Sequence, residues 1–212
     1  MITHHPSAET MLRLAAGTLP AGLSVVVRAH LENCPSCRDE LRTLEALGGA
    51  LLEELAPVTL DERAFNQVLA RLHEPAAPVA PRPPRQASGL LPKGMRLPAA
   101  LKGADIGRWV WVGWGIHHSR VRLPWAPEQN MMMFRVGSGR RVLHHSHGGA
   151  EFTQILAGAF SDETGHYVAG DIAETDETVQ HQPVAGPDGC ICLAALEGGL
   201  RFPWLDRLLH RG

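Results

Sequence analysis

Apolar side chains in the first third of the chain recur every three to four residues, the spacing of one face of an α-helix. The first stripe begins just after Ser7, a residue type that caps helix N-termini, and it is interrupted where Gly17 to Pro20 break the pattern. We therefore predict one helix over residues 8–16 and a second over residues 23–31.

A third helix is predicted from Pro35, because proline is tolerated in the first turn of a helix. Its stripe extends to Leu51, and the adjacent glycines at positions 48 and 49 are expected to bend or divide it. Thr59 and Glu62 have the spacing of a capping box, which predicts a fourth helix ending near His73.

Beyond the helices, seven prolines fall between Pro75 and Pro98. Proline fixes the backbone angle φ and removes a hydrogen-bond donor, so an extended segment is expected here. The predicted organisation is a helical domain at 1–75, a proline-rich linker at 76–98 and a second domain at 99–212.

The second domain has a different pattern, with short apolar runs separated by glycine and proline. Runs of this kind are typical of short strands in an antiparallel sandwich or barrel. The runs lie at 109–112, 131–136, 141–143, 152–156 and 191–196. The predicted fold class is multidomain α + β, with about four helices followed by a β-barrel.

The 212-residue chain has a formal net charge of -2, so no basic field favours nucleic acid, and a protein or small-ligand partner is expected instead. The start of the sequence shows no export signal and no membrane span, which predicts a cytoplasmic protein. With 4 cysteines in two close pairs and 12 histidines, metal ligation is favoured over disulfides.

The first candidate metal site is the HxxxCxxC pattern of His30, Cys34 and Cys37. Across a junction between two helices, one imidazole and two sulfurs can meet a single ion, and zinc takes four such ligands in a tetrahedron. The fourth ligand is expected from His5 or His4. The alternative is a reduced thiol pair beside a surface histidine.

The second candidate site combines His145, His147 and Glu151, flanked by Gly139 and Gly158. Alternation along a strand places the two histidines on one face, where a carboxylate after a glycine turn can join them. This ligand set suits zinc or another divalent metal such as manganese, iron or nickel.

The fourth ligand of this second site is expected to be His181, with His166 as the competing candidate. Cys190 and Cys192 share one face of a late strand, and we interpret them as buried apolar residues that would be redox-active only if they faced a cavity. The tryptophans at 109, 111 and 114 are assigned no site.

The histidine and cysteine spacing of residues 1–75 resembles the zinc-binding anti-sigma domain, and the glycine, histidine and glutamate spacing around His145 matches the first cupin motif. Together the two halves resemble the ChrR-type anti-sigma factors. The resemblance favours His5 over His4 as the distal zinc ligand, because His5 is closer to the Ser7 cap.

This resemblance implies a regulator that inhibits an extracytoplasmic-function sigma factor through its zinc domain. It also implies that the cupin domain is needed for release in response to an oxidant such as singlet oxygen. No direct contact with nucleic acid or membrane is expected. The alternative is a metal-dependent cupin enzyme, an oxygenase or isomerase, with an accessory helical domain.

Overall fold

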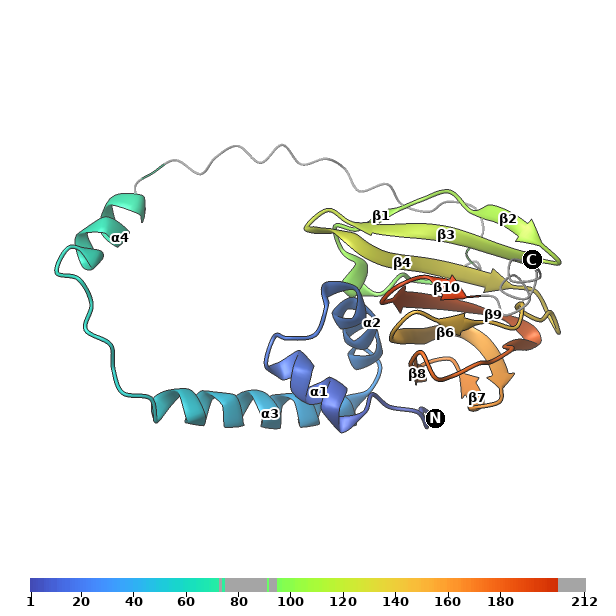
Figure 1. Ribbon diagram of the computed structural model, residues 1–212, viewed down its shortest axis with the longest axis horizontal. Coiled ribbons are helices and arrows are strands. Elements are labelled where there is room, and N and C mark those ends of the chain that lie inside the picture. Colours follow the sequence, from blue (N-terminus) through green and yellow to red (C-terminus); the bar gives the residue numbers. More distant parts are fainter. Residues whose placement is uncertain (73, 75–90, 92–94, 202–212) are drawn as a thin grey trace, which may run out of the picture.

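The computed structural model describes residues 1–72, 74, 91 and 95–201, so most of the predicted linker at 76–98 lies outside the described residues. Four α-helices precede the sheet, as predicted, and a short 3-10 helix, η1, leads into it (Figure 1). Their bounds are α1 Ala8–Ala15, α2 Ala21–Leu31, α3 Pro35–Glu53, α4 Ala64–Leu72 and η1 Ala99–Leu101. None of the helices in the described part of the chain is both long and apolar enough to cross a membrane.

The predicted helix starts are confirmed for α1 and α3. The Ser7 side chain accepts a hydrogen bond from the Thr10 amide at the start of α1, and Pro35 occupies the first turn of α3. The prediction of a capping box at Thr59 is wrong, because α4 begins only at Ala64. Asp61 makes the turn there instead, accepting from the Arg63 amide at 2.7 Å.

The second part of the chain is an antiparallel barrel, and the predicted fold class is confirmed. An eight-stranded sheet has the order β1-β3-β4-β9-β6-β7, with β2 paired to β3 and β8 to β6, while β5 and β10 pair separately. The strands are β1 Asp105–Ile106, β2 Val110–Gly113, β3 Ile116–Leu123, β4 Ala126–Val136, β5 Ser146–His147, β6 Glu151–Asp162, β7 Gly165–Val168, β8 Ile172–Thr175, β9 Val184–Leu196 and β10 Leu200–Arg201.

The prediction of a strand at 141–143 is wrong. Arg141 makes only an isolated bridge to Val184, and the chain then runs as an irregular segment to His145. By contrast, β3 was missed, because its sequence carries two adjacent histidines and two arginines that hide the alternation of its buried positions.

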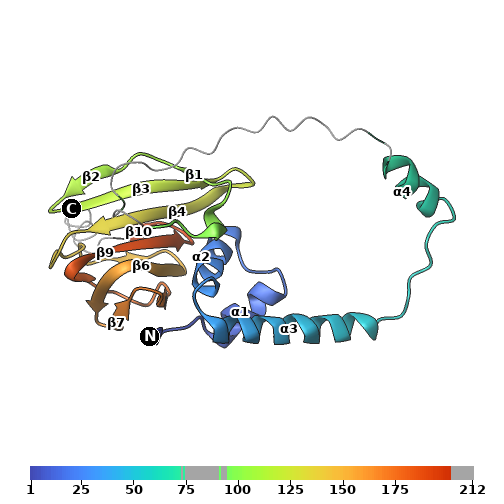
Figure 2. The same ribbon diagram turned by 180° about the vertical axis from the view of Figure 1, so that it is seen from behind.

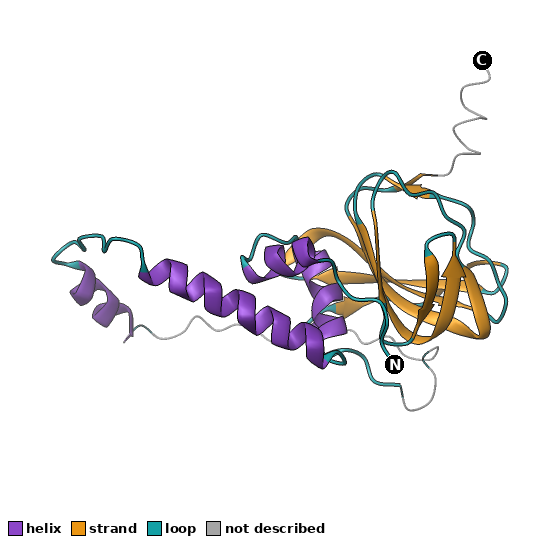
Figure 3. Ribbon diagram, turned by 90° about the horizontal axis from the view of Figure 1, so that it is seen from below, coloured by secondary structure: helices purple, strands orange, loops and turns teal. Residues whose placement is uncertain are grey.

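The apolar runs of β4 and β9 are continuous because both faces of these strands are covered. Met131 and Leu193 lie in a core shared with the helices, whereas Val136 and Cys192 lie in a second core inside the barrel. The strands curve around this inner core, with the helices on one side of the sheet (Figure 3).

Helix α2 lies between the sheet and the other helices, across β4, β6 and β9 (Figures 1 and 2). Its Gly22 allows close approach, since a Cβ there would lie 3.2 Å from Met131 and 3.5 Å from Ala195. The Gly22 amide donates to Gln129 at 2.8 Å. The helical part is therefore packed directly on the barrel.

Candidate metal centres

The first cluster gathers His5, His30, Cys34 and Cys37, and their ligand atoms all lie within 4.8 Å of one another. The Nδ1 atom of His5 lies 3.4 Å from the Cys34 sulfur and 3.3 Å from the Cys37 sulfur. Two ligands of one tetrahedral zinc ion, nitrogen at about 2.0 Å and sulfur at about 2.3 Å, stand about 3.5 Å apart. These separations match a shared zinc ion.

Local structure explains how three of these side chains converge. His30 lies in the last turn of α2, Cys34 is the N-cap of α3 and Cys37 lies in the first turn of α3. The fourth, His5, comes from the extended segment before α1. All four cysteines of the chain are free thiols.

The His30 ring is aimed by a contact from the barrel. Its Nδ1–H donates to the Gly170 carbonyl at 2.9 Å, which leaves the buried Nε2 without a partner. Burial lowers the pKa of His30, so the imidazole is neutral. A neutral ring held through one nitrogen, with the other unpaired, is how metal-bound histidines are arranged.

The two thiols differ in their readiness to ionise. Burial raises the pKa of both, but contacts with Ser36 and Cys37 outweigh it for Cys34 and lower that pKa. For Cys37, burial and the neighbouring Cys34 sulfur raise the pKa to about 12. A metal ion must therefore displace the Cys37 proton.

His4, the alternative distal residue, lies outside this cluster. Its Nδ1 is 3.2 Å from the Asp171 carboxylate, and its ring packs on Tyr167 with 4.4 Å between centroids. The structure thus brings His5 to the sulfurs and directs His4 to the barrel.

The second cluster gathers His145, His147, Glu151 and His181, all buried, with ligand atoms within 4.8 Å of one another. His147 lies on β5 and Glu151 opens β6, while His145 and His181 face each other through an isolated bridge. The competing His166 lies on β7, where its Nδ1 is 2.7 Å from the Ser161 hydroxyl, and it is not part of this cluster.

Two imidazoles of the second cluster are held so that their lone pairs converge. His145 donates from Nδ1 to the Leu143 carbonyl at 2.6 Å, and His181 donates from Nδ1 to the Asp162 carboxylate at 2.7 Å. Their Nε2 atoms lie 3.2 Å apart. Two lone pairs at this separation repel each other unless a proton or a metal ion lies between them, and two imidazoles converging in this way fit a metal ion.

The remaining two residues form an ion pair, with 2.5 Å between His147 Nε2 and Glu151 Oε2. Burial lowers the pKa of His147, but the bond to Glu151 outweighs it and raises that pKa. Burial raises the pKa of Glu151, and here too the pairing outweighs it and lowers the pKa. The carboxylate is therefore anionic and suited to a divalent cation.

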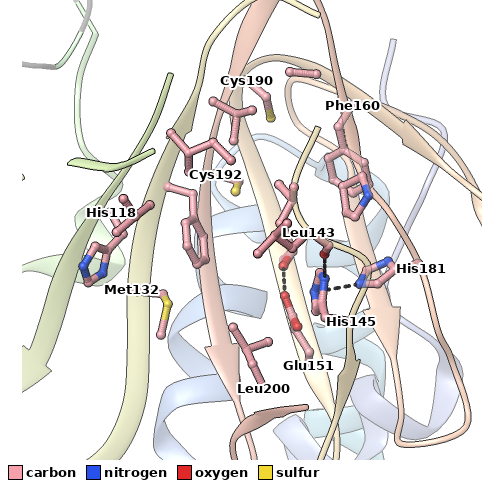
Figure 4. A pocket seen from close by; sticks show the side chains of 18 of the residues that line it. His118, Met132, Leu143, His145, Glu151, Phe160, His181, Cys190, Cys192 and Leu200 are labelled. Carbon is pink, nitrogen blue, oxygen red and sulfur yellow. Dashed lines mark hydrogen bonds between the residues drawn. The ribbon is translucent and has the colours of Figure 1, made fainter. Parts of the chain in front are cut away.

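A cavity of about 520 Å³ adjoins the second cluster and is lined mainly by apolar side chains (Figure 4). His145, Glu151 and His181 lie on its wall, and Cys190 and Cys192 also line it. The contact with Cys190, together with burial, raises the pKa of Cys192 well above its usual value, so that thiol is protonated.

Several supporting residues of the two clusters were missed by sequence reasoning, namely Leu143, Asp162 and Gly170. Trp114, to which the sequence assigned no role, lines the cavity. No local sequence pattern predicts these roles, because the folded chain alone brings each residue into contact with a histidine or with the cavity. Asp162, for example, lies 19 residues before His181.

A helical unit with a two-histidine, two-cysteine cluster, followed by a barrel with a three-histidine, one-carboxylate cluster, defines a two-domain protein that joins a zinc-finger unit to a cupin. Family models agree. A zinc-finger family matches residues 11–38, and the ChrR cupin-like domain family matches residues 101–198.

Relatives extend the match over nearly the whole chain. The anti-sigma-E factor ChrR of Cereibacter sphaeroides is 39% identical over 203 residues, covering 95% of this chain and 92% of that protein. The crystal structure of Rhodobacter sphaeroides SigE in complex with the anti-sigma ChrR matches with 36% identity and a TM-score of 0.71, covering 93% of this chain and 100% of the matched one. The chain belongs to the ChrR family of anti-sigma factors.

Proposed function

We propose that this chain binds and inhibits an extracytoplasmic-function sigma factor, with residues 1–75 as the inhibitory domain, 76–98 as a linker and 99–212 as a cupin sensor domain. The observation that carries the proposal is the full-length similarity to an anti-sigma factor known in complex with a sigma factor. Because sigma factors act in the cytoplasm, the proposal places the chain there.

An exposed apolar surface supports a protein partner. The distal half of α3 and the whole of α4 present large apolar side chains to solvent, more than half exposed at Leu51, Phe65 and Leu72. No residue of α4 is buried, and this helix lies apart from the barrel in Figure 1. Large apolar side chains exposed in this number on two helices are typical of interaction sites.

In the proposed function, zinc is held by His5, His30, Cys34 and Cys37. The ion would join the extended N-terminal segment to the junction of α2 and α3, and its binding free energy would add to folding stability. The cupin metal, zinc or another divalent ion such as manganese, iron or nickel, would be held by His145, His147, Glu151 and His181.

We further propose that release of the sigma factor in response to an oxidant such as singlet oxygen requires the cupin. The cavity beside the second cluster supports this, because it gives a small molecule access to the histidines and to two thiols. An oxidant or ligand shifts partner binding only if it acts differently on the bound and the free protein.

Co-expression with the sigma factors of the source genome, followed by co-purification, tests the first proposal. Leu51→Asp, which places a charge on the exposed face of α3, is expected to weaken the complex at least about tenfold. Val110→Asp is the matched control, since Val110 is 51% exposed on β2 and Leu51 is 57% exposed. Equal binding by wild type and Leu51→Asp would contradict this surface.

The roles of the two clusters need separate variants. Cys34→Ala is expected to lose zinc and release the sigma factor. A protein with His145→Ala and Glu151→Ala is expected to bind the sigma factor but fail to release it under singlet oxygen. Normal induction in that double variant would remove the cupin metal from signalling and favour the enzyme hypothesis, which turnover of small carbonyl substrates would then test.

A further inference from the structure

The turn between β7 and β8 belongs to the barrel, yet it reaches the first metal cluster. Its Gly170 carbonyl accepts the Nδ1–H of His30, and its Asp171 carboxylate binds the segment that carries His5. Gly170 is 140 positions from His30 in the chain, and Asp171 is 167 positions from His4. The contact therefore joins the two parts of the protein at the proposed zinc site.

Asp171 fixes the backbone immediately before His5. Its fully buried carboxylate accepts hydrogen bonds from the Thr3 amide at 2.7 Å and the His4 amide at 3.1 Å, and a third from the Val168 amide within the barrel. Burial raises the pKa of Asp171, but these donors outweigh it and lower the pKa, so the group is a carboxylate. Hydrogen bonds to a charged acceptor are among the strongest in proteins.

Gly170 is adapted to the same contact. Its φ of +99° favours glycine, and a Cβ at this position would lie 2.8 Å from a side-chain carbon of Ile2. The extended N-terminal segment therefore packs directly on the turn, while the Gly170 carbonyl faces His30.

We propose that the Gly170–Asp171 turn is a positioning element of the zinc site, through which the barrel holds two of the four ligands of the helical domain. Gly170 orients His30, and Asp171 places His5. This inference rests on the zinc site proposed above. Zinc retention then depends on the docking of the N-terminal segment on the barrel, and by linkage zinc strengthens that docking.

The same turn is bonded to the strand that carries a residue of the second cluster. The Gly170 amide donates to the Ile155 carbonyl and the Ile155 amide donates to the Asp171 carbonyl, both at 2.9 Å. Ile155 lies on β6, which begins at Glu151. If a change at the second cluster moved β6, the Gly170–Asp171 turn would therefore move with it and shift the ligands of the first cluster.

The test compares Asp171→Asn with Glu174→Gln in the full-length chain. Both carboxylates lie in the barrel and accept a hydrogen bond from a backbone amide of the N-terminal segment. Glu174 accepts from the Ser7 amide at 3.2 Å, which follows His5 in the chain, whereas Asp171 binds the residues just before His5. Asparagine would place a side-chain NH₂ donor against backbone N–H groups from which the Asp171 carboxylate accepts hydrogen bonds. Thr3→Pro, which removes one of those N–H groups from the N-terminal side of the contact, is a second variant with little risk to the barrel.

The readouts are zinc transfer to a colorimetric chelator and the absorption of the cobalt-substituted protein. Thiolate-to-cobalt charge-transfer bands report the first cluster alone, because the second contains no sulfur ligand. Asp171→Asn and Thr3→Pro are expected to lower metal affinity at the first cluster by about 10- to 100-fold. Their cobalt bands should weaken as water replaces His5, whereas Glu174→Gln should match wild type.

Unchanged affinity and cobalt bands in both Asp171→Asn and Thr3→Pro would overturn the inference while leaving the zinc site intact. Equal losses in Glu174→Gln and Asp171→Asn would also overturn it, since general undocking would then explain the effect. A wild-type chain with no thiolate-to-cobalt bands would instead overturn the zinc site itself, and the inference with it.

Discussion

Cys37 determines how zinc binding should depend on pH. Burial raises its pKa to about 12, so its thiol is protonated at neutral pH and must lose that proton to zinc. Burial lowers the pKa of His30, so this imidazole is mainly neutral at neutral pH and contributes less to the proton release than Cys37. Zinc affinity of the first cluster is therefore expected to rise about tenfold per unit from about pH 6 to pH 8 for this thiol alone. Chelator competition measures the slope, and a flat profile would exclude thiolate ligation by Cys37.

Asp162 should control the second cluster through the tautomer of His181. Its carboxylate accepts the Nδ1–H of His181, which leaves Nε2 as the metal-binding nitrogen. In Asp162→Asn the amide would donate to Nδ1 instead and move the ring proton to Nε2. Metal affinity at the second cluster is expected to fall at least about tenfold.

Metal titration of the purified chain measures this effect, with Glu163→Gln as the control. Glu163 is exposed, adjacent in sequence and bonded only to a backbone amide among the contacts described, that of Gln182 at 2.9 Å. Equal metal affinity in Asp162→Asn and wild type would show that Asp162 does not orient the ring.

At the scale of elements, α3 runs unbroken through Gly48 and Gly49, where the sequence predicted a bend or a break. A Cβ at either position would meet nothing within 4 Å. Replacing both by alanine is expected to stabilise the exposed half of α3 by about 0.5–1 kcal/mol per residue, because glycine loses more backbone entropy in a helix.

Hydrogen exchange of the α3 amides measures this local stability. Gly22→Ala in α2 is the contrasting variant, because its Cβ would lie 2.9 Å from the Gln129 side-chain oxygen. It should destabilise the contact with the sheet. Faster exchange in the double variant at Gly48 and Gly49 would contradict the prediction, because it would show that alanine destabilises α3 at these positions.

At the scale of the whole molecule, the helices and the barrel share one hydrophobic core. Leu23 and Val26 of α2 are almost fully buried in the cluster that contains Met131 and Leu193 of the sheet. Glu32 adds a polar contact, accepting from the amides of residues 99 and 100 at 2.9 and 2.8 Å. Residues 1–75 and 95–212, expressed as separate chains, are therefore expected to associate and co-purify.

Val26→Asp provides the control for that experiment, since a buried unpaired charge should abolish the association. Size-exclusion chromatography of the co-expressed pieces measures it. Separate elution of the two wild-type pieces would show that the linker, rather than the shared core, keeps them together.

Features that depend on neighbours in the sequence were predictable. Ser7 as a cap, Pro35 in a first turn and the α + β order followed from local spacing, and the resemblance of the two metal motifs to known proteins indicated the ChrR family. Cys34 and Cys37 meet His30 across a single helix junction, so their local spacing was enough to predict that the three would lie together. The failures were also local: the strand at 141–143 and the Thr59 cap have the right residue types but lack the partners that would form them.

The sequence by itself predicted the four helices, the change to strands and most of the candidate metal ligands, because helix caps, strand alternation and ligand spacing act over a few residues, while the family followed from the resemblance of its motifs to known proteins. Only the tertiary structure decided that the helices share a core with the barrel, that His181 rather than His166 joins the second cluster, and that Gly170 and Asp171 hold the first. These contacts join residues far apart in the chain, and close packing, which no periodic pattern encodes, brings them together.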